Sequence, residues 1–453
     1  MAPCNPAGES LPIHSPLPIF LPLAGDQMLS LHAARERNKP TGQDAKIGLA
    51  IAGGGPIGGM YELGALRALD EALDGLDLTR LDCYIGVSSG AFLAAGLANR
   101  IDTAQMCRIF ITGDSDDVQF RPQTFLRPAL FEYLRRAASL PRLTLDWWRS
   151  MLPGPGGANE AHWSDLVARF GGLIPTGLFD NAEVERFLRD VFTRRGRSND
   201  FRELDRTLYV VAVDLDSGEA VRFGDAGWDD VPISKAVQAS AALPGLYPPV
   251  EILDKSGRAR HFVDGALRRT MHASVLLERG VDLLIGINPL VPFNSGSHQD
   301  GDGIDHRLAE GGLPAVLSQT FRTLLQSRMQ VGLARYTQQY PDVDQLVFEP
   351  NAGDGELFFA NAFGFAARKR VCELAYRNTL ADLRARRDTL RPMLAAHGIT
   401  LRDEVLDDER RTLGGGLSPT SPRSTETTAR LRRALEDVEH KVAKRKAGNS
   451  RIR

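Results

Sequence analysis

The chain has 453 residues, 43% of them apolar, with a formal net charge of −2 and four cysteines. This length and apolar content allow a large core in one or two domains, and the nearly balanced charge argues against a general nucleic-acid-binding protein, which needs a basic excess. The cysteines are far apart and form no paired motif. Their spacing argues against a disulfide framework or a structural zinc site and favours a reducing, cytoplasmic compartment.

The N-terminal segment, residues 1–45, is rich in proline, glycine and polar residues. We expect it to be disordered or loosely attached. It lacks the basic start of a secretory signal peptide, and prolines interrupt its only apolar stretch. No run in the chain approaches the roughly 18 apolar residues of a membrane-spanning helix, so any membrane contact is expected to be peripheral.

Residues 46–400 alternate strand-like apolar runs with helical patterns, which predicts a layered α/β domain. Runs this apolar are typical of strands buried on both faces of a mainly parallel sheet. The predicted strands are 47–53, 83–87, 207–215 and 283–288. The stretch 100–200 is too long for a plain connection and has helical periodicity, so we expect an inserted helical cap there.

The first predicted strand leads into the sequence GGGPIGG, in which Gly53, Gly55 and Gly58 spell a dinucleotide-binding fingerprint ahead of a helical pattern from Met60. A dinucleotide site also needs an acidic residue at the end of the second strand to hold the ribose. The nearest carboxylate, Asp82, precedes that strand and would lie at its opposite end. The spacing therefore counts against a nucleotide-dependent oxidoreductase, although the loop still presents N–H groups to negative charge.

The second predicted strand ends in the sequence GVSSG, in which Gly86 and Gly90 flank Ser88. A strand, a sharp turn and a helix of small residues are the elements of a nucleophile elbow. Such a turn projects the Ser88 hydroxyl above the start of the helix and directs the Ser89 N–H to the place where an oxyanion forms.

A serine hydroxyl becomes a good nucleophile only when a base accepts its proton. Among the downstream histidines, His261 alone lies near the end of a strand-like run. Three residues later, Asp264 ends that run and is followed by Gly265 and Ala266. A poorly hydrated carboxylate within hydrogen-bond reach can accept the serine proton directly. A plain Asp-Gly turn is the alternative interpretation.

These sequence blocks, in this order, resemble the patatin-like phospholipases. The resemblance rests on GGGPIG, GVSSG, DGA and the segment QASAALPGLYPPV at 238–250. It covers about 47–270 and continues more weakly to about 385. It implies a three-layer α/β fold and a serine acyl hydrolase that cleaves phospholipid or neutral lipid esters through an acyl-enzyme intermediate, without metal or organic cofactor. A catalytically weak lipid-binding or scaffold protein of the same fold is the alternative.

The resemblance also implies roles for individual residues. Ser88 matches the family nucleophile and Asp264 matches its general base. The glycine loop matches the oxyanion hole, with Gly54 and Gly55 as the foremost donors, because Pro56 has no N–H. The full set of residues expected at the oxyanion hole is Gly53, Gly54, Gly55, Gly58 and Ser89.

One position departs from the family pattern. Ile57 stands where the family commonly has Arg or Lys before the last glycine of the loop. Either another cation compensates, for which Arg268 and Arg269 after the DGA sequence are candidates, or the activity or substrate differs.

Two segments outside the expected site are candidates for lipid contact. Residues 143–152 combine Trp147 and Trp148 with aliphatic side chains and Arg149, as membrane-interface segments do, although packing of the cap explains them equally well. Residues 401–453 are expected to be a linker and a basic helical tail. The tail could lie on an anionic surface, pair as a short coiled coil or remain a solvated helix. The sequence predicts no oligomeric state.

Overall fold

The computed structural model describes residues 29–34, 45–113, 115, 118, 120, 176–291, 312–350 and 365–417. Most of the predicted cap, with Trp147 and Trp148, lies outside the described residues, as does the basic tail beyond 417. The same holds for 1–28, the larger part of the segment expected to be loosely attached. These predictions therefore remain predictions.

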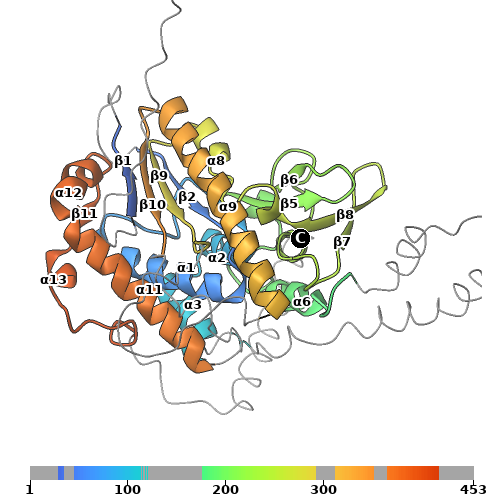
Figure 1. Ribbon diagram of the computed structural model, residues 1–453, viewed down its shortest axis with the longest axis horizontal. Coiled ribbons are helices and arrows are strands. Elements are labelled where there is room, and N and C mark those ends of the chain that lie inside the picture. The colour runs from blue at the N-terminus through green and yellow to red at the C-terminus, as the bar shows by residue number, and fades with distance from the viewer. Residues whose placement is uncertain are drawn as a thin grey trace, which may run out of the picture.

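The described residues are built around a nine-stranded sheet (Figure 1). Its strand order is β1-β10-β9-β2-β4-β5-β8-β7, with β6 paired to β5. The central strands from β10 to β5 run parallel, whereas β1, β6, β7 and β8 pair in antiparallel fashion. The strands are β1 Leu29–His32, β2 Ile47–Ile51, β4 Cys83–Val87, β5 Thr207–Asp214, β6 Ala220–Phe223, β7 Val250–Leu253, β8 Ala259–Asp264, β9 Leu283–Ile287 and β10 Asp344–Phe348.

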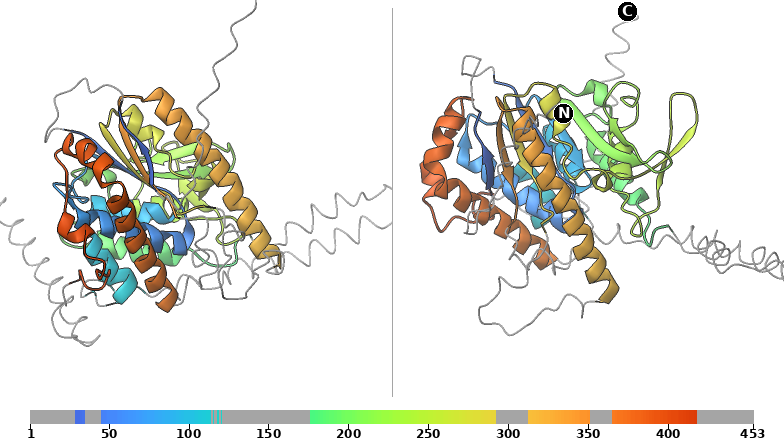
Figure 2. Two further views of the ribbon diagram at one scale, coloured as in Figure 1. Left: turned by 60° about the vertical axis from the view of Figure 1, so that its left-hand side comes forward. Right: turned by 45° about the horizontal axis from the view of Figure 1, so that its top comes forward.

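Helices cover both faces of this sheet and make three layers (Figures 1 and 2). On one face, α1, α2 and α11 share a core with Leu49 and Ile51 of β2. On the other face, α8 and α9 share a core with Ala50 of the same strand. The helices are α1 Gly55–Ala72, α2 Ser89–Ala98, α3 Thr103–Cys107, α6 Ala182–Phe192, α7 Ile233–Ser240, α8 Ser274–Glu278, α9 Gly312–Gln339, α11 Phe365–Ala385, α12 Arg387–Ala395 and α13 Asp403–Leu406.

The predicted α/β class with a mainly parallel sheet is confirmed, and the four predicted strands are β2, β4, β5 and β9. Every residue of β2, β4 and β9 is buried, as expected for strands covered on both faces. The register pairs Ile51 at the end of β2 with Gly86 of β4 and Ile287 of β9. The loops that follow these strands therefore open along one edge of the sheet, where sites in α/β proteins form.

Two boundaries differ from the sequence expectation. Residues 29–32, within the segment expected to be loosely attached, form the edge strand β1, which pairs with β10. Beyond residue 400, β11 (Thr400–Leu401) pairs with β3 (Leu73–Asp74), and the Arg411 guanidinium lies 2.7 Å from the Glu71 carboxylate on α1. The described residues up to 417 are thus packed on the domain.

Candidate active site

Ser88 lies at the sharp turn between β4 and α2. Its backbone has φ 51° and ψ −119°, a conformation that is costly for a residue other than glycine. The turn is held by α7, because the Ser88 N–H donates to Ser240 Oγ over 2.8 Å and the Ser240 hydroxyl donates to the Val211 carbonyl over 2.6 Å. Ser240 belongs to the segment 238–250, so this segment supports the predicted elbow.

The two glycines that flank Ser88 are required by close packing. A Cβ atom on Gly86 would lie 2.5 Å from the Ala91 Cα, and one on Gly90 would lie 2.4 Å from the carbonyl oxygens of Ile51 and Ala52. Real Cβ contacts are never this short, so α2 approaches β2 and β4 only because both positions are glycine. The two glycines of the predicted elbow motif are therefore required on steric grounds.

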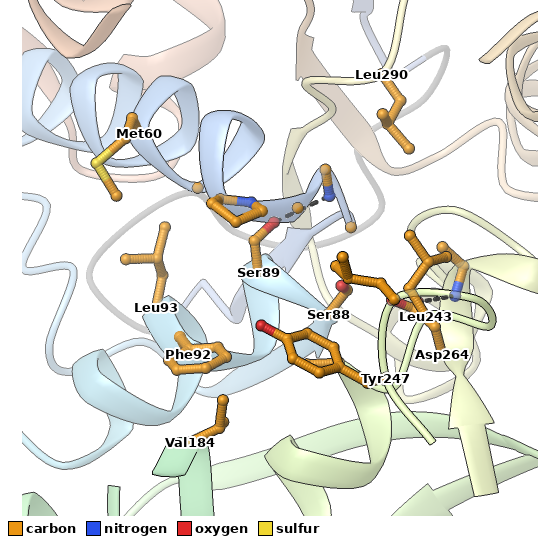
Figure 3. Close-up of a pocket in the computed structure, with 18 of the residues that line it drawn as sticks. Met60, Ser88, Ser89, Phe92, Leu93, Val184, Leu243, Tyr247, Asp264 and Leu290 are labelled. Carbon is orange, nitrogen blue, oxygen red and sulfur yellow. Dashed lines mark hydrogen bonds between the residues drawn. The ribbon is translucent and has the colours of Figure 1, made fainter. Parts of the chain in front are cut away.

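Asp264 ends β8, and only 3% of its surface is exposed. β8 pairs with β5, which lies beside β4, so the strand order brings Asp264 next to Ser88 (Figure 3). The carboxylate accepts the Ala266 N–H over 2.9 Å, and the Asp264 N–H donates to the Ala242 carbonyl over 3.0 Å. Residues Gly265–Leu267 form a short 3₁₀ turn.

The pKa of Asp264 is perturbed in a direction that suits a base. Burial raises the pKa of its carboxyl to about 6, and hydrogen bonds from the Ser88 side chain and the Ala266 N–H act in the opposite direction. A carboxylate with this pKa is ionised at neutral pH and is a stronger base than an exposed aspartate. The structure therefore places a carboxylate of raised pKa beside Ser88 in the wall of one cavity.

The glycine loop uses most of its N–H groups inside the protein. The Gly53 N–H donates to the Thr270 carbonyl over 3.3 Å, that of Gly54 to Ser89 Oγ over 2.9 Å, and that of Gly58 to the Gly54 carbonyl over 3.1 Å. The N–H groups of Gly55 and Ser89 begin α1 and α2, where a helix offers them no partner. Among the described residues, neither of these two N–H groups has an acceptor.

Glu62 was not singled out by sequence reasoning. It lies on α1, is fully buried, and its Oε1 accepts the Ser89 hydroxyl over 3.1 Å. Ser89 Oγ in turn accepts the Gly54 N–H (Figure 3). Glu62 is therefore linked to the glycine loop through one hydroxyl. Burial raises the pKa of Glu62 well above its usual value. A signal for it existed in the sequence, since α1 is buried nearly all round and a carboxylate inside such a helix requires a partner.

A cavity of about 270 Å³ lies beside Ser88 and Asp264. Its wall includes Ser89, Gly54 and Gly55, but most of it is apolar (Figure 3). The large apolar residues of the wall are Met60, Phe92, Leu93, Phe110, Phe120, Val184, Leu243, Leu246, Leu290 and Phe321. A lining of this kind suits the chain of an acyl group.

Two arginines from different helices also line this cavity. Arg322 of α9 is half-buried and donates to the Val291 carbonyl over 3.5 Å, and Arg368 of α11 is buried and donates to the Phe110 carbonyl over 2.7 Å. Burial lowers the pKa of both guanidinium groups, although arginine stays charged at any pH of interest. The cavity thus combines an apolar wall with positive charge.

The residues expected to compensate for Ile57 lie elsewhere. Arg268 and Arg269 are exposed, and neither is among the described residues that line the cavity. Ile57 itself is 8% exposed, belongs to the hydrophobic core and is also absent from this wall. The side chain at the departing position therefore does not face the cavity.

The downstream histidines that the structure describes do not join this site. His261 is exposed, with its ring 3.7 Å from the Glu251 carboxylate. His272 is buried, its ring lies 3.4 Å from the Gly265 carbonyl, and burial lowers its pKa to about 4. Within the described ranges no histidine lines the cavity. Of the described residues that line the cavity, Asp264 supplies the carboxylate beside Ser88.

Two further findings concern the described residues as a whole. They contain no cluster of three or more His, Cys, Asp or Glu side chains arranged to hold a metal ion. None of the helices in the described ranges combines the length and apolar character needed to cross a membrane.

Comparison with known families identifies the class of protein to which this chain belongs. A family model described as patatin-like phospholipase matches residues 49–277, slightly more than half of the chain. The chain therefore belongs to the patatin-like phospholipase family, a family of lipid acyl hydrolases, and the resemblance inferred from the four sequence blocks is confirmed. A search of curated proteins found no relative of this sequence.

Several solved structures are similar to part of the chain. VipD from Legionella pneumophila is 18% identical, with 60% of this chain and 55% of that chain covered and a TM-score of 0.29. Pseudomonas aeruginosa ExoU, solved with SpcU, is 14% identical, with 71% and 60% covered and a TM-score of 0.26. Human GIVD cytosolic phospholipase A2 is 13% identical, with 78% and 60% covered and a TM-score of 0.32. The chain thus spans somewhat more than half the length of these proteins.

Proposed function

We propose that the protein is a serine acyl hydrolase that cleaves lipid carboxylic esters with a Ser88–Asp264 dyad. The observation that carries this proposal is the position of the buried Asp264 carboxylate beside Ser88 in the cavity wall, together with its pKa, which burial raises to about 6. Asp264 accepts the Ser88 proton while Ser88 Oγ attacks the ester carbonyl carbon. The alcohol leaves with that proton, and water, deprotonated by Asp264, then releases the fatty acid and restores Ser88.

The tetrahedral intermediate needs donors for its negative oxygen. The N–H groups of Gly55 and Ser89 are the best candidates, since both begin helices at the cavity wall and have no acceptor among the described residues. The N-termini of α1 and α2 add partial positive charge at the same place. Gly53, Gly54 and Gly58 support the loop, because their N–H groups already hold internal hydrogen bonds.

The shape and charge of the cavity favour a lipid ester as substrate. Its apolar wall suits an acyl chain, and the guanidinium groups of Arg322 and Arg368 suit a negatively charged head group. We infer that phospholipids are hydrolysed in preference to neutral glycerides.

The dyad is tested with a short-chain nitrophenyl ester, which needs no lipid surface. We expect Ser88→Ala and Asp264→Asn each to lower kcat/KM by roughly a thousandfold or more, with the double variant little worse than either single one, because the two residues act as a unit. His261→Ala, which changes an exposed histidine near Asp264, serves as the control and keeps its activity. Turnover that survives Ser88→Ala would rule the proposal out.

A further inference from the structure

The helix α9 presents an unusual outer face. It has 28 residues and contains no aspartate or glutamate, whereas it has three arginines, at 322, 328 and 335. Three large apolar side chains on it are exposed: Val316 by 42%, Leu324 by 59% and Val331 by 69%. Their spacing of eight and seven residues places them on one side of the helix, one above another.

Positive charge lies beside these exposed apolar side chains of α9. Arg328 lies four residues after Leu324, and Arg335 lies four residues after Val331. Each arginine is therefore a neighbour of an exposed apolar side chain on the helix surface. Both arginines are exposed. The Arg328 guanidinium donates to the Leu267 carbonyl over 3.2 Å, next to the turn that carries Asp264. The outer face of α9 therefore combines exposed apolar side chains with positive charge and offers no acidic residue of its own.

The same helix forms part of the cavity wall through Ser318, Phe321 and Arg322. Figures 1 and 2 show α9 as a long rod along the outside of the molecule, and α6 contributes Val184 to the same cavity wall. A surface that covers the outer face of α9 would thus lie about one helix diameter from the cavity.

We propose that the α9 stripe, defined as Val316, Leu324 and Val331 together with Arg335, docks the enzyme on an anionic lipid bilayer. Apolar side chains that flank basic ones are the combination that partitions into the interface of a negatively charged membrane. A bilayer fits better than a protein partner, because the apolar side chains stand two turns apart and do not form a contiguous core. This proposal rests on the proposed function in one respect: docking would serve to bring lipid substrate to the cavity.

The test uses the Ser88→Ala protein, so that vesicles are not hydrolysed during the measurement. Sedimentation with vesicles of phosphatidylglycerol and phosphatidylcholine is compared with sedimentation with pure phosphatidylcholine. We expect binding to the anionic vesicles to be stronger and to weaken as salt is added. Leu324→Gln/Val331→Gln should lower the partition coefficient by about tenfold or more, since two exposed apolar side chains no longer enter the bilayer. Arg335→Gln should lower it several-fold on the anionic vesicles only.

The matched control is Leu215→Gln/Leu253→Gln, which removes two side chains that are 53% and 61% exposed on other elements. This control should bind like the parent. The proposal fails if the parent ignores anionic vesicles, if the α9 variant binds equally well, or if the control loses as much. A change of molecular mass in the α9 variant would instead identify the stripe as a contact between two copies. In the active protein, nitrophenyl ester turnover should be unchanged by the α9 variant, which separates this result from a failure of the dyad.

Discussion

Asp264 must be ionised to act as a base, although only 3% of its surface is exposed. Because burial raises its pKa to about 6, protonation removes the base below that pH. We expect kcat/KM for a soluble neutral ester to rise with pH, with a midpoint near 6, and to level off above 7. A pH–rate profile from 4.5 to 8.5 measures this. A midpoint near 4, as for an exposed aspartate, would contradict it.

The same burial carries a cost in stability. The folded-state pKa lies above the ordinary 3.8, so the folded protein binds more protons than the unfolded chain between about pH 4 and pH 6, and Asp264 lowers stability as pH rises through this window. Asp264→Asn should therefore raise the free energy of unfolding at pH 8, by about 3 kcal/mol at the upper limit. The gain should vanish near pH 4. Denaturant unfolding of both proteins at the two pH values checks this, and an inactive variant that is also less stable at pH 8 would contradict it.

Glu62 is the residue that we expect to position the glycine loop, through Ser89. Glu62→Ala removes the acceptor of the Ser89 hydroxyl and should lower kcat about tenfold with little change in KM, since a lost hydrogen bond of this kind is worth roughly 1–3 kcal/mol. Glu62→Gln keeps an acceptor oxygen at that place and should restore most of the activity. Equal losses in both variants, or a loss only in KM, would show that Glu62 has no positioning role.

At the scale of elements, α9 brings Arg322 to the cavity. Arg322→Gln should lower kcat/KM for an anionic phospholipid in detergent micelles about tenfold, because one charge-assisted contact to the head group is lost. The soluble neutral ester should lose much less. Arg268→Gln removes an exposed arginine that sequence reasoning placed near the site, and it should leave both rates unchanged. Equal effects of Arg322→Gln on the two substrates would show that the Arg322 guanidinium does not bind the head group.

The elements that could be predicted from sequence are those whose own residues determine them. Four strands are apolar enough to be recognised without their pairing partners, namely β2, β4, β5 and β9. The glycines of the elbow likewise predict a tight turn. β1 and β10 could not be found in the same way. β1 has four residues and lies at the sheet edge, and β10 includes Asp344 and Gln345, so both depend on pairing partners far away in sequence.

At the scale of the whole molecule, the parts of the site were predictable and their contacts were not. Ser88 and Asp264 belong to local motifs, but they meet because β5 lies between β4 and β8 in the sheet, an order that no local pattern gives. The same holds for Arg322 and Arg368, which reach one cavity from separate helices. Ile57 departs from the family motif, and this departure motivated the alternative of a scaffold protein. Its side chain packs into the core. The residue type at position 57 therefore gives no reason to prefer a scaffold protein over an enzyme.

The dyad is tested most directly by covalent labelling. An alkyl fluorophosphonate reacts only with a serine that is activated and accessible, and peptide mass spectrometry identifies the modified residue. We predict one label per chain, on Ser88, with none in Ser88→Ala and much slower labelling in Asp264→Asn. Ester hydrolysis without labelling of Ser88, or stoichiometric labelling of another serine, would contradict the proposed mechanism.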